Sequence, residues 1–419
     1  MISSIVNFVL QEKKYLYLLP KNARLLVISY FIQGIAYILI DIFISAYIWR
    51  IKGEVFSVAL YNLGNFIMLP IIFYFNGILL KKIKITVLYF FGSCTAALGA
   101  ICVVFFPQLN SIYYLLYGAL YGIGNGLYWA NRNFLTLQET ESKNRNYFVG
   151  LNFTFDTISN ILIPFIFGWF IVLSNNIHLF SIDQSYKILI LFSFLLLFSA
   201  GLIVLNTQFK SPQDLRLIIN RITKRWAFVR IFTISIGIFD GTTYFLPTLI
   251  ILIKLGHEGI LGTINSILSI ATVGMLYYYS RNAKIQHQKP LYKYSVIVGF
   301  LAAIIFGVFY NRISTFIFII INSLALNFMW LTFNPLIMDI IDEEVINDKQ
   351  SRYSLIADQE LFLNIGRYIS ILILALMLLY FGQQNTVRFT PFIIFLFQII
   401  LLIFSWKKIE RSEKNVVGY

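Results

Sequence analysis

About twelve apolar stretches follow one another along this chain, each close to the length of a helix that crosses a membrane. Such a helix needs roughly 20 mostly apolar residues. The connections between the stretches are short, so the sequence predicts an all-α integral membrane protein. The predicted spans are 25–49, 55–80, 85–106, 109–136, 147–174, 186–205, 228–252, 258–279, 291–310, 313–338, 353–380 and 387–406.

The composition agrees with a membrane location, because 58% of the residues are hydrophobic and only 12% are charged. Soluble proteins carry about 25% charged residues. The net charge of +14 could indicate a nucleic-acid partner, but basic cytoplasmic loops explain it more simply, and we expect no nucleic acid. Cys94 and Cys102 lie in one apolar stretch, which argues against a disulfide scaffold or a metal site. No phosphate-binding loop motif is present, and we expect no cofactor.

Lysine and arginine concentrate in alternate loops, which sets the predicted orientation. The pattern places both termini and the basic loops in the cytoplasm, so we expect a multi-pass protein of the cytoplasmic membrane. The predicted cytoplasmic residues include Lys21, Arg24, Lys81, Lys82, Lys84, Arg221, Lys224, Arg225, Arg230 and Arg352. The opposite side would hold only Arg50, Lys52, Lys187, Lys254, Arg312 and Arg388.

The longest polar connection lies midway and divides the predicted spans into two halves of six helices each. We predict an N-terminal half at 1–205, a cytoplasmic central loop at 206–226 and a C-terminal half at 227–419. A short repeat supports this division, since the fourth span ends in Trp129 and Asn133 and the tenth ends in Trp330 and Asn334. Parallel repeats with a site between them near the middle of the membrane are typical of transporters.

On these features the chain resembles the major facilitator superfamily. Members of that family carry a Gly-x-x-x-Asp-Arg/Lys-x-Gly-Arg-Lys motif after the second helix. The matching segment here keeps Gly77 and a basic character, but Lys81 stands in place of the aspartate and Lys84 in place of the second glycine. The resemblance implies secondary transport rather than an enzyme activity. It also implies that the first, fourth, seventh and tenth helices line a cavity, which the fifth and eleventh flank.

The ionisable residues well inside the predicted spans all fall on those six helices. A charge at a lipid-facing helix centre costs about 2.5–3.5 kcal/mol, so these side chains are expected to face protein or water. They are Asp41, Arg132, Asp156, Asp240, Asp358, Glu360 and Arg367. Polar and aromatic residues predicted to line the cavity are Tyr37, Tyr61, Asn62, Asn65, Tyr128, Trp129, Asn131, Asn133, Asn327, Trp330 and Asn334.

Each charged position has a structural and a functional interpretation. Arg132 and Asp156 either pair across a helical hairpin or face the cavity. Asp240 lies between glycines and shortly before a proline, which suggests local unwinding in a mobile helix, or it hydrogen-bonds to a neighbouring helix. Arg367 either anchors a carboxylate or phosphate of the substrate or pairs with an intramembrane acid. Asp41 either carries a coupling proton or lies in the outer vestibule.

The sequence therefore predicts a secondary active transporter that moves a small organic solute by alternating access. Five intramembrane acids against two bases favour coupling to protons, with sodium as the other candidate ion. We expect a monomer that contacts only the bilayer, its solute and its coupling ion. One alternative is an exporter of amphipathic drugs or lipids. A more distant alternative is a membrane-embedded lipid-linked group transferase, although the loops are short for such a site.

Overall fold

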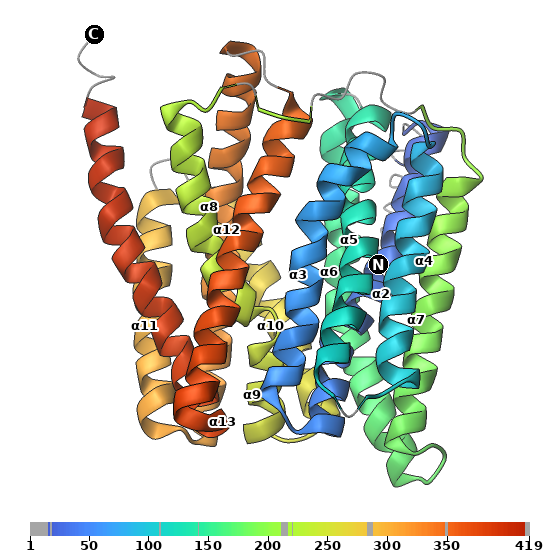
Figure 1. Cartoon of the computed structure of the whole chain (residues 1–419), viewed down its shortest axis with the longest axis vertical. Helices are drawn as coiled ribbons and strands as arrows, with labels where there is room; N and C mark the ends of the chain where they lie inside the picture. Colours follow the sequence, from blue (N-terminus) through green and yellow to red (C-terminus); the bar gives the residue numbers. More distant parts are fainter. Residues whose placement is uncertain are drawn as a thin grey trace, which may run out of the picture.

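The computed structural model describes residues 16, 19–108, 110–140, 142–210, 217–219, 221–282, 288–347 and 351–414. Within these ranges the chain forms long helices joined by short turns, and the helices lie roughly along one direction (Figure 1). The helices are α2 (Lys21–Lys52), α3 (Val55–Leu79), α4 (Ile85–Phe105), α5 (Ile112–Glu139), α6 (Ser142–Asn176), α7 (Ile182–Leu205), α8 (Lys224–Thr243), α9 (Leu246–Lys254), α10 (Glu258–Asn282), α11 (Gln288–Phe309), α12 (Arg312–Asn347) and α13 (Arg352–Lys414).

Ten helical segments of the described chain are long and apolar enough to cross a membrane, which confirms the predicted all-α membrane fold. One of them, Lys224–Lys254, combines α8 and α9, and another, Arg352–Ile400, combines the last two predicted spans. Helix α5 is not among the ten, because its tyrosines, glycines and asparagines lower its hydropathy. Its Asn125 and Asn131 are buried within the helical bundle, as a polar side chain at membrane depth requires.

Local chemistry sets several helix ends. Gly53 ends α2 in the left-handed conformation at φ 64°, which glycine adopts without a steric penalty. Ser181 and Gln184 form a reciprocal capping box at the start of α7, four residues before the predicted start at 186. Gly382, at φ 71° and ψ 171°, interrupts α13 and lets the chain reverse, so the last two predicted spans form a hairpin (Figure 1).

The sequence suggested that the helix unwinds at Asp240, but the structure breaks the helix at another position. Helix α8 stays regular through Asp240, and the break falls at Tyr244 and Phe245, after which Pro247 occupies the first turn of α9. The glycines beside Asp240 serve close packing instead. A Cβ on Gly237 would lie 2.1 Å from the Leu363 carbonyl oxygen, so this glycine lets α8 and α13 meet backbone to backbone.

Helices α2–α7 lie on one side of the molecule in Figure 1, and α8–α13 lie on the other. Pairs that pack across this division are α3 with α13, α6 with α10, and α2 with α9. We call the end at which α7 ends and α8 begins the central-loop end, and the end that holds Gly53 and Gly382 the opposite end. The division into an N-terminal half, a central loop and a C-terminal half as folding units stays a prediction.

The retained motif glycine has a structural explanation. A Cβ on Gly77 would lie 2.9 Å from the Tyr353 ring and 2.2 Å from Leu217. Tyr353, at the start of α13, also donates a hydrogen bond of 2.6 Å to the Phe73 carbonyl oxygen of α3. Glycine at this position therefore allows α13 to pack on the central-loop end of α3.

Candidate functional site

Arg132 of α5 lies in a shell of aromatic side chains. Its guanidinium carbon is 4.7 Å from the ring centre of Tyr30, 4.7 Å from that of Trp129 and 5.8 Å from that of Tyr128. Tyr30 also donates a hydrogen bond of 3.0 Å to the Arg132 carbonyl oxygen, which fixes α2 against α5. Cation–π contacts of this kind hold a guanidinium in a low-dielectric site and leave its N–H edge available.

Asp156 of α6 faces Arg132 at a distance of 3.8 Å between Oδ2 and Nη2. The two side chains are 40% and 18% exposed, respectively, so the site is partly open. Gly34 of α2 makes room for the carboxylate, because a Cβ there would lie 2.9 Å from Asp156 Oδ1. The structure thus brings the predicted pair together, but at a separation longer than a hydrogen bond.

Arg367 of α13 and Asp240 of α8 form a second, much tighter pair. Nε and Nη2 of Arg367 lie 2.7 and 2.6 Å from Asp240 Oδ2, and Nη1 donates at 3.1 Å to Asn364. The guanidinium stacks on Phe66 of α3 at 4.7 Å, and both charged side chains are nearly buried. Arg367 therefore pairs with an intramembrane acid, and each of its three nitrogens contacts an oxygen.

Asp41 of α2 is surrounded by tyrosines. Tyr121 of α5 donates a hydrogen bond of 2.6 Å to Asp41 Oδ1, and Tyr244, at the break between α8 and α9, also interacts with this carboxylate. Among the side chains that the structure describes, no lysine or arginine forms an ion pair with Asp41. By contrast, Asp358 is held by two hydrogen bonds from Arg230, at 2.7 and 2.6 Å.

A row of aromatic contacts runs between Asp41 and Arg132 along the facing sides of α2 and α5. The ring of Tyr37 lies 6.1 Å from Tyr121 and 5.1 Å from Tyr128. Because residues 121, 128 and 132 recur at helical spacing, they occupy one face of α5. The N-terminal group of helices therefore has a polar, tyrosine-rich seam that links both charged positions.

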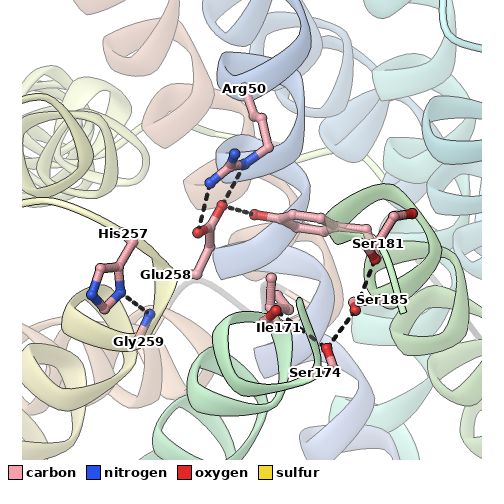
Figure 2. Close-up of polar contacts among 9 residues, drawn as sticks. Arg50, Ile171, Ser174, Ser181, Ser185, His257, Glu258 and Gly259 are labelled. Atoms are coloured by element: carbon pink, nitrogen blue, oxygen red, sulfur yellow. Dashed lines mark hydrogen bonds and ion pairs between the residues drawn. The ribbon is translucent and has the colours of Figure 1, made fainter. Parts of the chain in front are cut away.

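An ion pair that the sequence did not predict joins the two groups of helices at the opposite end (Figure 2). Arg50, at the end of α2, donates from Nε and Nη2 to the two carboxylate oxygens of Glu258, at the start of α10, at 2.7 and 2.8 Å. Tyr186 of α7 donates to the same carboxylate at 3.0 Å. The sequence placed Arg50 in a loop and Glu258 at the first position of a predicted span, and only their positions at helix ends could have indicated a pairing.

Close backbone packing of α6 on α10 accompanies this ion pair. A Cβ on Gly262 would lie 2.0 Å from the Pro164 carbonyl oxygen, and one on Gly168 would lie 2.5 Å from the Glu258 carbonyl oxygen. Gln383, beside the bend in α13, bonds to the amide of Val55 at 3.0 Å and to the carbonyl of Gly53 at 2.8 Å. The opposite end is therefore joined at several points.

The remaining predicted residues are less clearly placed at a site. Asn133 is exposed on α5, one residue beyond Arg132. Trp330 packs against Phe333 within α12, with their ring centres 6.1 Å apart, and the side chain of Asn334 lies outside the described residues. Only the first Trp-x-x-x-Asn pair has both side chains described, so the repeat as two related sites stays a prediction. Among the described side chains, no group of three His, Cys, Asp or Glu could hold a metal ion.

Comparisons with known proteins agree with this architecture. The family model of the major facilitator superfamily matches residues 26–357. The protein YqgE of Bacillus subtilis (strain 168) is 29% identical over 351 residues, which are 81% of this chain and 78% of YqgE.

Two solved structures are similar in fold. One is a POT family transporter in complex with 5-aminolevulinic acid, with a TM-score of 0.67, 12% identity, and coverage of 93% of this chain and 96% of that one. The other is the Escherichia coli fucose:proton symporter FucP, with a TM-score of 0.57, 16% identity, and coverage of 91% and 98%. Because the family match spans most of its length, this chain belongs to the major facilitator superfamily.

Proposed function

We propose that this protein is a proton-coupled secondary transporter that moves a small organic solute across the cytoplasmic membrane by alternating access. The observation that carries the proposal is the contrast between Asp41 and three of the other acids within the predicted spans. Asp156, Asp240 and Asp358 each face an arginine, whereas hydroxyl groups meet the Asp41 carboxylate. A carboxylate without a cation partner can take up and release a proton without breaking an ion pair.

The location of Asp41 supports a coupling role. It contacts Tyr121 of one helical group and Tyr244 of the other, so its environment changes when the groups move. Tyr244 lies at the break between α8 and α9, where a helix can bend at low cost. The FucP neighbour is itself a fucose:proton symporter, which supports proton coupling as a mechanism for this fold.

Alternating access requires that contacts at one end break while those at the other form. The Arg50–Glu258 pair and the α6–α10 packing hold the opposite end together. The central-loop end is joined as well, because Tyr353 of α13 contacts Phe73 and Gly77 of α3, so transport would require the two ends to separate in turn. With the central-loop end in the cytoplasm, as the basic loops favour, separation at that end would admit the solute to Arg132 and Asp156 from the cytoplasmic side. We further propose that the protein works as a monomer.

The test is accumulation in proteoliposomes. Vesicles that contain the full chain are exposed to a mixture of amino acids, sugars, nucleosides and short peptides, with and without a proton gradient, and their contents are identified by mass spectrometry. We expect at least one solute to accumulate only when a proton gradient is present. The orientation of the gradient that drives accumulation then shows whether solute and proton move in the same or in opposite directions. Asp41→Asn should abolish gradient-driven accumulation but allow exchange of solute.

Asp183→Asn is the matched control, because Asp183 pairs with Lys187 at the exposed end of α7 and an asparagine there can still accept the hydrogen bond that Tyr47 donates. Its accumulation should equal that of the parent protein. Accumulation that a protonophore or Asp41→Asn leaves unchanged would contradict proton coupling. The absence of solute movement in every condition, with folded protein in the vesicles, would contradict transport itself.

A further inference from the structure

The two arginine–aspartate pairs within the membrane differ in how fully each charge is satisfied. Arg367 uses three of its nitrogens on Asp240 and Asn364, at 2.6–3.1 Å. Arg132 meets Asp156 at 3.8 Å, beyond hydrogen-bond distance. A strong arginine–carboxylate pair is bidentate, at about 2.7–2.9 Å. The Arg132–Asp156 pair therefore brings opposite charges together without joining them.

We propose that this pair binds an amphoteric solute, with Arg132 binding its carboxylate and Asp156 binding its ammonium group. The proposal rests on the transport function proposed above and names the class of solute for that site. A ligand with both charges can enter between the two side chains and satisfy each of them. The tight Arg367–Asp240 pair has no comparable opening.

The aromatic shell determines how such a ligand approaches. Tyr30 and Trp129 both lie within 4.7 Å of the guanidinium carbon, a distance typical of rings stacked on the guanidinium. The N–H groups project from the edge of the guanidinium plane, where they match the geometry of a carboxylate. Trp129 is itself partly exposed and offers a flat apolar surface to the body of the solute.

Charge balance favours a ligand with both signs. Asp156 and Arg132 are neutral as a pair, and a solute with one positive and one negative group keeps the site neutral after binding. A simple anion would leave Asp156 without a cation, and a simple amine would leave Arg132 without an anion. An unpaired charge in a partly buried site is unfavourable. The rival arrangement is an anion bound to Arg132 together with a proton on Asp156.

The experiment compares ligands that share one skeleton. Thermal unfolding of the purified full chain is measured with phenylalanine, 3-phenylpropionate and 2-phenylethylamine, and with 5-aminovalerate, valerate and pentylamine. We expect the amphoteric member of at least one set to bind at least about tenfold more tightly than both of its singly charged relatives. Arg132→Gln and Asp156→Asn should each remove this preference, and Asp183→Asn should keep it.

If Arg132→Gln does not fold, Arg132→Lys replaces it in the test. A lysine keeps the positive charge but lacks the planar pair of donors that a carboxylate binds. It should weaken amphoteric binding without abolishing it. A parent protein that binds 3-phenylpropionate or valerate more tightly than the amphoteric member of the same set would overturn the proposal in favour of an anion bound together with a proton on Asp156. Equal binding across both sets, or none, would also overturn it. Proton-driven accumulation of only neutral or singly charged solutes in the vesicle assay would overturn it while supporting proton-coupled transport.

Discussion

Arg50 of α2 and Glu258 of α10 form a two-point ion pair that joins the two groups of helices at the end opposite the central loop. The partners are unequal, since the Glu258 side chain is 1% exposed and that of Arg50 is 39% exposed. Separation of the groups at this end must break the pair. In the proposed alternating-access cycle, the strength of this pair therefore contributes directly to the balance between the two states.

Because the two side chains are buried to different extents, Arg50→Gln and Glu258→Gln should destabilise the closed end by different amounts. Arg50→Gln leaves a buried carboxylate without its cation, which should cost about 3–5 kcal/mol in the state closed at this end. Glu258→Gln should cost less, because the freed Arg50 can reach solvent and Tyr186 keeps a partner. Maleimide labelling of Ile171→Cys, a buried position on α6, reports the opening, with Cys94 and Cys102 first replaced by serine.

Labelling should be fastest in Arg50→Gln, intermediate in Glu258→Gln and slowest in the parent. Lys187→Gln is the control, because it breaks only the exposed Asp183–Lys187 pair and should change stability by about 0.5 kcal/mol or less. Equal labelling in Arg50→Gln and the parent would mean that the pair does not hold this end closed.

Gly262→Ala tests the backbone contact between α6 and α10. The new methyl group would lie 2.0 Å from the Pro164 carbonyl oxygen, and backbone atoms cannot yield as a flexible side chain does. We expect an overpacking cost of about 1–3 kcal/mol and faster labelling of Ile171→Cys. Gly274→Ala on the same helix meets no atom within 4 Å and should instead stabilise the helix by about 1 kcal/mol. Identical behaviour of the two variants would contradict the close packing.

The Arg367–Asp240 pair predicts a recovery by double substitution. Arg367→Gln leaves Asp240 unpaired in a nearly buried position and should destabilise the protein by about 3–5 kcal/mol. Arg367→Gln combined with Asp240→Asn replaces two charges by two neutral groups of similar shape and should regain much of that loss. Melting temperatures of the single and double variants measure the recovery. A double variant no more stable than the worse single one would argue against the direct pairing.

Gly382→Ala isolates a purely conformational cost. No atom lies within 4 Å of the new methyl group, but the backbone at φ 71° and ψ 171° is accessible essentially to glycine alone. We expect a loss of about 1–3 kcal/mol. Gly150→Ala, which is equally free of contacts but helical, is the matched control. A melting temperature unchanged by Gly382→Ala would mean that the hairpin does not need this backbone geometry.

The free-energy cost of exposing a charge to lipid explains which residues could be identified from the sequence. A charge in an apolar helix must turn inward, so Arg132, Asp156, Asp240 and Arg367 were identifiable, and the all-α membrane fold followed from apolar length. Which charges meet depends on the packing of helices distant in the sequence. Arg367 and Asp240 are 127 positions apart and Arg50 and Glu258 are 208 apart, separations at which no local spacing indicates a contact.

The position of the helix break follows the same logic. Glycines beside Asp240 suggested unwinding there, but they are equally suited to close helix packing, and the sequence alone does not distinguish the two uses. The contact with Leu363 of α13 decides between them. Chain orientation, coupling ion and oligomeric state stay predictions, because they depend on surroundings that the chain alone does not contain.

A substitution at Gly34 would change the proposed solute site. The carboxylate of Asp156 occupies space that any larger residue at position 34 would claim. One added methyl group would displace this carboxylate. A displacement toward Arg132 would bring the two side chains within hydrogen-bond distance and leave no room for a solute between them. Selectivity in this transporter would then depend on a residue that never touches the solute. Relatives that diverge at this position would differ in cargo while they keep every charged residue in place.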